Sequence, residues 1–166
     1  MIDDIDAKIL EILQSNSRTP NAEIARRVGL AASAIFERIR KLEERGVIQG
    51  YSTLVDPRSI GLSLTAFIFV RTDEPVGRPE SPHLMAAIPE VQEVHHIAGE
   101  DCYLLKVRIG DTQDLGRLLR EKIGAIPAVR STRTTIVLDT IKESAGLPLG
   151  AEHRATEHSS LEKVPA

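Results

Sequence analysis

The residues best suited to chemistry lie between Ser33 and Arg45, where hydroxyl, carboxylate and basic groups recur at helical spacing. At about 100° per residue, one side of this segment gathers Ser33, Glu37, Arg40, Lys41 and Glu44, flanked by Ala34, Arg38 and Arg45. Small side chains let a backbone approach base edges, and Arg or Lys then reaches phosphates or guanine. The pattern favours recognition of double-stranded DNA. The alternative is an ordinary amphipathic helix with a solvated charged face.

Three predicted helices and a tight turn would position these residues. A short helix is expected after Thr19-Pro20-Asn21, where Thr19 or Asn21 can cap the free amides. Gly29 then suits a left-handed residue just past the helix end. The next helix, over 32–45, has one apolar stripe: Ile35, Ile39 and Leu42. With an N-terminal helix opened by acids at 3–6, the segment predicts a helix-turn-helix domain.

Charge and composition bound the class of protein. The 166 residues carry a net charge of −3, whereas 18–50 has seven Lys or Arg and four Glu, a net of +3. Attraction to phosphate is therefore modest per copy, so tight binding requires a dimer. A single cysteine, Cys102, predicts no intramolecular disulfide and is compatible with a reducing cytoplasm. No apolar run reaches the length of a membrane span, and the N-terminus lacks a signal-peptide core, so we expect a soluble cytoplasmic protein without a membrane partner.

After a short strand expected at 51–55, the apolar period becomes strand-like. Strands are expected at 62–72, 91–97, 103–109 and 129–139, with helices at 82–88 and from 112 to 123. The order β-α-β-β-α-β predicts a ferredoxin-like fold of the α+β class. Leu84, Met85 and Ile88 are expected to point inward from the first of these helices, and Ile136, Val137 and Leu138 to form the apolar centre of the last strand. One sheet face would remain open, which predicts a homodimer.

The domain boundaries follow from these patterns. We predict a helix-turn-helix domain over 1–50, a strand and hinge linker over 51–61, and a ferredoxin-like domain over 62–143. The remaining 144–166 loses periodicity and mixes Gly, Pro, His, Glu and Ser, so we expect a mobile tail.

Both domains together resemble the Lrp/AsnC family of bacterial and archaeal transcription regulators, over about residues 2–143. The residues that carry the resemblance are IDAKILEILQ, AEIARRVGL with SAIFERIRKLEERGVIQGY, GEDCYLLKVRI and VRSTRTTIVLDTIKE. The resemblance implies a sequence-specific DNA-binding regulator whose dimers associate into tetramers or octamers. It also implies that a small effector, often an amino acid, binds between dimers, and that no cofactor is needed.

The resemblance carries site residues over by position. For contact with DNA it implies Ser33, Ala34, Glu37, Arg38 and Lys41. For the effector it implies the turn between the two middle strands: Ala98, Gly99, Glu100, Asp101, Cys102 and Tyr103.

Three departures from the family pattern bear on these sites. Ala31-Ala32 stands where the family often has a capping Ser or Thr with proline, so the cap is missing or supplied late by Ser33. Glu37 stands where a basic residue is frequent in the family. Its carboxylate either accepts a hydrogen bond from cytosine N4 or pairs with Lys41, and we favour the pairing in the free protein. In the effector turn Cys102 replaces the usual Asp, which leaves Asp101, Glu100 or neither to face a ligand amine.

Other signals point away from catalysis and metal binding. His95 and His96 are adjacent on a predicted strand, so they face opposite sides and do not share one metal. Cys102 is either a packed residue or a redox sensor beside Lys106. We therefore predict no enzyme and no metal. The alternatives kept are a sirohaem-decarboxylase-like enzyme on the same architecture, and a ligand-binding or assembly module without DNA function.

Overall fold

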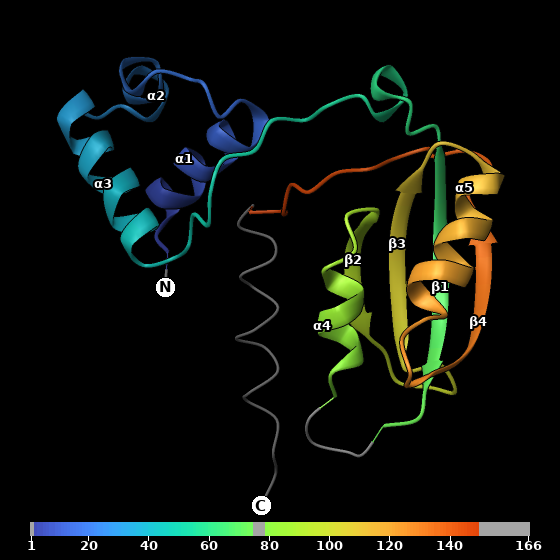
Figure 1. Cartoon of the computed structure of the whole chain (residues 1–166). Coiled ribbons are helices and arrows are strands. Elements are labelled where there is room, and N and C mark those ends of the chain that lie inside the picture. Colours follow the sequence, from blue (N-terminus) through green and yellow to red (C-terminus); the bar gives the residue numbers. More distant parts are fainter. Residues whose placement is uncertain (1, 75–78, 150–166) are drawn as a thin grey trace, which may run out of the picture. The chain divides into compact units, whose positions relative to one another are not determined.

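The structure is a computed structural model that describes residues 2–74 and 79–149. Within the described residues the chain divides into two compact units, one formed by 2–53 with 143–149 and the other by Leu54–Lys142. Figure 1 shows helices alone in the first unit and a sheet with helices in the second. Each unit has its own apolar core.

The first unit contains three helices: α1 (Asp4–Ser15), α2 (Asn21–Val28) and α3 (Ala32–Glu44). Their buried centre consists of Ile9, Ile24, Ala25 and Ile35. Gly29 ends α2 with φ +81°, the left-handed conformation that the sequence predicts at this turn. The three-helix arrangement with this turn confirms the predicted helix-turn-helix.

The helix starts differ from the prediction at one place. Asp3 caps α1, because its carboxylate accepts a hydrogen bond from the backbone N–H of Asp6. The Asp6 carboxylate accepts a hydrogen bond from the backbone N–H of Asp3 in return, which completes a capping box. At α2 the cap residue is Pro20, and no side chain caps the helix. The predicted cap by Thr19 or Asn21 is therefore wrong. Thr19 instead donates its hydroxyl to the carbonyl of Asn16, 2.7 Å away, so its side chain stabilises the turn that ends α1.

The second unit is a four-stranded antiparallel sheet of order β2-β3-β1-β4. Its elements are η1 (Pro57–Ile60), β1 (Leu64–Thr72), α4 (Ser81–Ala86), β2 (Val91–His96), β3 (Tyr103–Ile109), α5 (Thr112–Arg117), η2 (Leu118–Ile123) and β4 (Val129–Ile136). Because β1 and β2 both pair antiparallel with β3, they are parallel to each other, as a split βαβ arrangement requires. The ferredoxin-like α+β fold is confirmed. β1 lies centrally in the sheet, as its two-sided apolar sequence predicts.

The core of this unit lies between the sheet and its helices. Alternate residues of β1 and β3 are buried, together with Met85, Leu115, Leu118 and Ile123 from the helical segments. The inward predictions are confirmed for Met85 and Ile88 and wrong for three other residues. Leu84 is exposed on α4, because the six-residue helix buries only the side that carries Met85. Leu138 lies beyond the end of β4 and is 99 % exposed, and Ile136 is also exposed, since β4 is an edge strand.

The segment between the two predicted domains contains no strand. Residues 51–56 form no regular structure, and η1 follows, so the strand predicted at 51–55 is wrong. A strand needs a hydrogen-bonded neighbour, and no described strand pairs with this segment. Of the predicted tail, 144–149 has no regular structure, and the Leu147 backbone bonds to Gln14 at 2.6 Å and 3.0 Å. The rest of the tail, 150–166, lies outside the described residues.

Candidate nucleic-acid interface and effector turn

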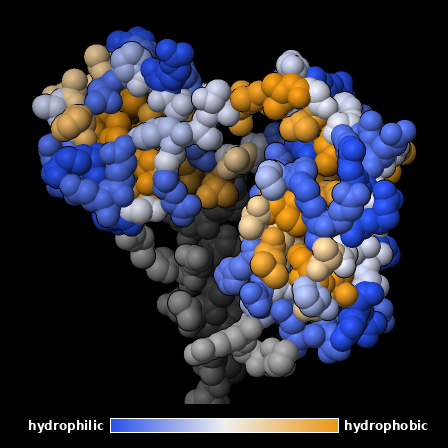
Figure 2. Space-filling model, viewed as in Figure 1, coloured by the Kyte–Doolittle hydropathy of each residue, from blue (hydrophilic) through white to orange (hydrophobic). Residues whose placement is uncertain are grey.

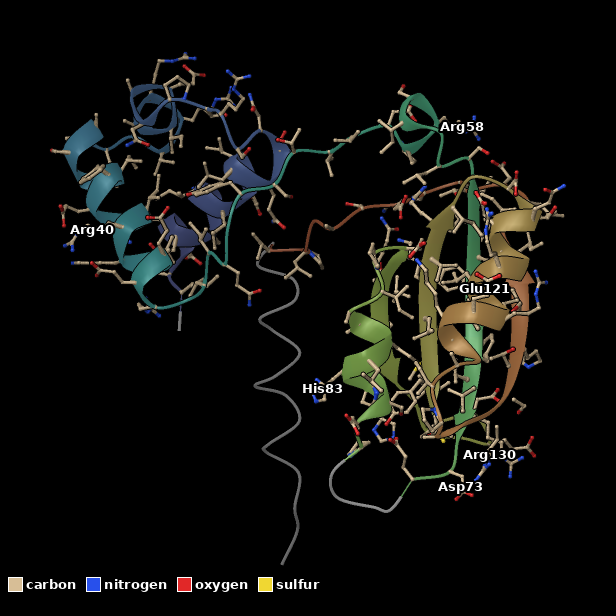
Figure 3. All side chains as sticks on the ribbon, in the orientation of Figure 1. Arg40, Arg58, Asp73, His83, Glu121 and Arg130 are labelled. Atoms are coloured by element: carbon tan, nitrogen blue, oxygen red, sulfur yellow. The ribbon has the colours of Figure 1, made fainter. Side chains whose placement is uncertain are left out.

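The exposed side of α3 presents most of the predicted DNA-contacting residues together. Ser33, Glu37 and Lys41 are exposed, and Ala34 and Arg38 are half-buried. Figure 3 shows the labelled Arg40 projecting from the side of α3 away from α1. Ala31 caps α3 without a side-chain hydrogen bond, so of the two alternatives the missing cap is the one observed. The first turn of α3 is therefore lined by small residues, with free backbone amides that can face a phosphate.

Arg38 is held by the first helix rather than projecting freely. Its Nη1 donates to Asp6 Oδ1 at 2.6 Å and to Asp3 Oδ2 at 2.7 Å. The Asp6 side chain is only 11 % exposed, whereas that of Arg38 is 31 % exposed. These two carboxylates raise the pKa of the Arg38 guanidinium. Arg38 thus links α3 to the capping box of α1, a structural role in addition to the predicted one.

Glu37 pairs with an arginine one turn further along α3. Its Oε2 accepts from Arg40 Nη2 at 2.8 Å, and Arg40 also donates to Glu44 at 2.5 Å. The Arg40 guanidinium holds the pKa of Glu37 below its usual range. The predicted pairing of Glu37 with Lys41 is wrong, because Arg40 takes the carboxylate at i+3. Lys41 makes no ion pair within the described residues, which leaves its ammonium available for a phosphate.

The predicted effector residues form the turn between β2 and β3. Ala98, Gly99 and Glu100 are exposed, Asp101 and Cys102 are half-buried, and Tyr103 is buried at the start of β3. Gly99 has φ +140°, a conformation that side chains rarely adopt. Burial raises the pKa of the Tyr103 phenol. His96 lies beside Tyr103 with ring centroids 5.3 Å apart. The turn is therefore anchored at its end and open at Gly99.

One carboxylate of this turn already has a basic partner. Asp101 Oδ2 accepts from Arg133 Nη2 at 2.9 Å, and Arg133 comes from β4. The Arg133 guanidinium also lies over the Phe69 ring, 4.0 Å from its centroid, and Phe69 pairs with Arg133 across β1 and β4. An acidic and a basic group thus meet beside an aromatic ring. This arrangement can bind an ammonium and a carboxylate of one small molecule.

Cys102 and the two adjacent histidines are separate features. Cys102 is half-buried, and its Sγ donates to the carbonyl of Thr72 at 3.7 Å, which supports the packed alternative over the redox one. His95 contacts Glu93 at 3.2 Å, while His96 lies against Tyr103. Within 2–74 and 79–149 no group of three or more His, Cys, Asp or Glu could hold a metal ion. No helix in these ranges is long and apolar enough to cross a membrane.

Sequence reasoning misses the contacts of three residues that shape the two sites. The sequence indicates only that the acidic residues Asp3 and Asp6 are favourable at the start of a helix, although their i, i+3 spacing also indicates a capping box. Their bonds to Arg38 span 32 and 35 residues, and no local spacing reveals such a contact. Arg133 likewise stands out in the sequence only as part of a strand.

Comparison with known proteins agrees with this architecture. Residues 2–49 match a winged helix-turn-helix DNA-binding family, and residues 65–147 match the Lrp/AsnC ligand-binding domain. An HTH-type transcriptional regulator from Pyrococcus horikoshii is 41 % identical over 149 residues, covering 89 % of this chain and 97 % of that protein.

Two solved structures are similar over nearly the whole chain. A transcriptional regulator from Neisseria meningitidis in complex with L-methionine has a TM-score of 0.82 at 31 % identity, covering 90 % of this chain and 97 % of that one. A feast or famine regulatory protein from M. tuberculosis complexed with L-methionine has a TM-score of 0.82 at 35 % identity, covering 89 % and 99 %. Both domain families match in order along the chain, and one relative is 41 % identical over 97 % of its length. This chain therefore belongs to the Lrp/AsnC family of transcriptional regulators.

Proposed function

We propose that this regulator binds operator DNA through α3, with Ser33, Ala34, Glu37, Arg38 and Lys41 at the DNA. The observation that carries the proposal is the exposed side of α3, where small residues begin the helix and Lys41, which forms no ion pair within the described residues, follows. A helix of this kind enters the major groove with its first turns at the base edges. The paired Arg40 supplies a second basic group once DNA phosphates compete with Glu37 and Glu44.

A genomic DNA pull-down tests this function, because it lets the protein select its own operator. The full chain is immobilised, sheared genomic DNA is applied, and bound fragments are sequenced and then measured by fluorescence anisotropy. We expect a limited set of promoter fragments bound more tightly than random DNA. Equal binding of selected and random fragments would contradict sequence-specific regulation and favour an assembly module.

We further propose that a free amino acid is the effector and binds at the turn formed by 98–103. Two structural relatives are described as complexes with L-methionine, which supports this ligand class. In this chain the Asp101–Arg133 pair offers a carboxylate for the ligand ammonium and a guanidinium for its carboxylate. The open backbone at Gly99 leaves room beside the pair, since nothing lies within 4 Å of an added Cβ.

Titration calorimetry with L-methionine and the other amino acids tests the effector site. Gly99→Trp should abolish the heat of binding by filling the turn, and Arg133→Ala should weaken binding by removing the partner of the ligand carboxylate. Arg130→Ala is the matched control, because Arg130 also lies on β4 and at the same end of the sheet, but its guanidinium pairs with Asp73 at 3.0 Å and not with Asp101. Unchanged binding by Gly99→Trp would remove 98–103 from the site.

We also propose that the protein acts as a homodimer that assembles further into tetramers or octamers. Several large apolar side chains of the second unit are exposed: Leu54, Val55, Ile60, Leu138 and Ile141. Figure 2 shows hydrophobic residues gathered over the segment that leads to η1. Exposed apolar surface on this scale is typical of an interface between subunits. Light scattering after size exclusion measures the assembly, and a monomer at micromolar concentration would contradict it.

Catalysis is not part of the proposal. The sirohaem-decarboxylase-like alternative is not favoured, because relatives are named as an HTH-type transcriptional regulator and a leucine-responsive regulatory protein. We propose that the protein acts in the cytoplasm, together with the DNA that it is proposed to bind.

A further inference from the structure

Phe36 is an aromatic residue on α3 that the apolar core does not use. Its side chain is 55 % exposed, although the preceding residue, Ile35, is completely buried. Within the described helices of the first unit, Phe36 is the one large apolar residue that is exposed. Burial in the free chain therefore does not explain why an aromatic residue stands here.

The position of Phe36 places it among the candidate DNA contacts. Residues three and four apart are neighbours on a helix surface, so Phe36 lies next to Ser33 and Arg40. Arg40 projects from the side of α3 away from α1 (Figure 3). Phe36 is also only one turn into a helix that starts at Ala32, where side chains of a reader helix contact bases.

From this placement we propose that Phe36 reads thymine in the operator by packing its ring against the C5-methyl group. In the major groove the thymine methyl is the apolar feature that distinguishes one base from the others, and phenylalanine is among the side chains that contact it. The alanines at 31, 32 and 34 let the α3 backbone approach the groove closely enough for a ring to reach that methyl. This inference rests on the proposed DNA-binding function of α3.

A surface contact between protein chains is the competing use of an exposed aromatic ring. The neighbours of Phe36 argue against it, since Glu37, Arg40 and Glu44 form a charged network on the same side of the helix. Such a network stays favourable where water solvates it, whereas the core of a protein interface is depleted in charge. The competing use predicts that removal of the ring changes the assembly.

A double-mutant cycle between protein and DNA tests the proposal. The probe is a duplex selected by the genomic pull-down, in which each thymine is replaced in turn by uracil, so that only one methyl group is lost. We expect wild type to lose about fourfold in affinity at one or two positions, the value of one buried carbon. Phe36→Ala should bind the thymine and uracil duplexes equally at those positions. Tyr51→Ala, which removes an equally exposed aromatic outside the helices, should retain the sensitivity to uracil.

The possible results separate this inference from the function on which it rests. If Phe36→Ala keeps the full sensitivity to uracil, or wild type shows none, the protein still binds its selected duplex but Phe36 does not read thymine. A shift in molar mass for Phe36→Ala in light scattering would assign the ring to a subunit contact and overturn the inference. Failure of wild type to select any fragment overturns the proposed function itself.

Discussion

Arg38 on α3 donates to Asp6 on α1 across 2.6 Å, which ties the candidate reader helix to the capping box that begins the chain. The same Nη1 also donates to Asp3 at 2.7 Å. Both carboxylates therefore stabilise the start of α1 and the orientation of α3 at once. Since the guanidinium carries further N–H donors and is partly exposed, it can still reach a phosphate while this link persists.

Replacing Arg38 by Ala should lower the free energy of unfolding of the first unit by about 1 kcal/mol, because two charge-assisted hydrogen bonds are lost at a partly exposed site. It should also weaken operator binding without changing the assembly. Urea unfolding followed by far-ultraviolet circular dichroism gives the stability, and hydrogen exchange of α1 amides assigns the loss to this unit. Arg40→Ala is the control, because Arg40 lies on the same helix but pairs only with residues of that helix. It should lower the free energy of unfolding by less than Arg38→Ala does. If the α1 amides of Arg38→Ala exchange as slowly as those of wild type, Arg38 does not stabilise α1 and the proposed link between α3 and α1 is contradicted.

Asp3 predicts a dependence of stability on pH. The backbone N–H of Asp6, followed by the Arg38 guanidinium, holds the pKa of Asp3 below its ordinary value of 3.8. A carboxyl whose pKa is lower in the folded state stabilises the fold above the unfolded pKa, and this contribution is lost as pH falls through the folded value. Asp3→Asn, which can still cap α1, should therefore be less stable than wild type at pH above about 5 and approach it below about 3.

The corresponding experiment is urea unfolding of both proteins across this pH range. Glu11→Gln removes one carboxylate from α1 without touching the capping box, and it serves as the control. A constant difference between wild type and Asp3→Asn at every pH would show that the charge of Asp3 does not contribute.

The turn between α2 and α3 predicts a cost from backbone conformation alone. Gly29 has φ +81°, and nothing lies within 4 Å of an added Cβ. Gly29→Ala should thus destabilise the unit by about 1 kcal/mol through its left-handed backbone, without a steric clash. Gly29→Asn should cost less, because asparagine tolerates this conformation. Equal losses for Ala and Asn in thermal unfolding would point to a contact rather than to backbone strain.

Much of the fold could be predicted because local patterns determine it. The two-sided apolar sequence of β1 placed it centrally, and Gly29 marked the turn. The failures occur where the outcome depends on distant partners. Residues 51–55 have strand-like composition but no neighbouring strand, and Leu138 continues an apolar run past the point where β4 stops pairing.

The sites were predictable as segments, and less so as sets of contacts. Spacing placed Ser33, Glu37 and Lys41 on one exposed side of α3. It could not show that Glu37 is taken by Arg40 rather than Lys41, since both lie within reach on a helix surface. Nor could it show that Arg133, 32 residues beyond Asp101, meets that carboxylate across the sheet.

The central claim is that α3 binds DNA, and Lys41 tests it most directly because its ammonium has no ion pair within the described residues. The measurement is the affinity of wild type and Lys41→Ala for one pull-down fragment across a series of salt concentrations. We predict weaker binding by Lys41→Ala and a logarithmic salt slope that is shallower by about 1 for each bound subunit, as loss of one phosphate contact requires. Equal affinity and an equal slope for the two proteins would contradict the assignment of α3 as the DNA-binding helix.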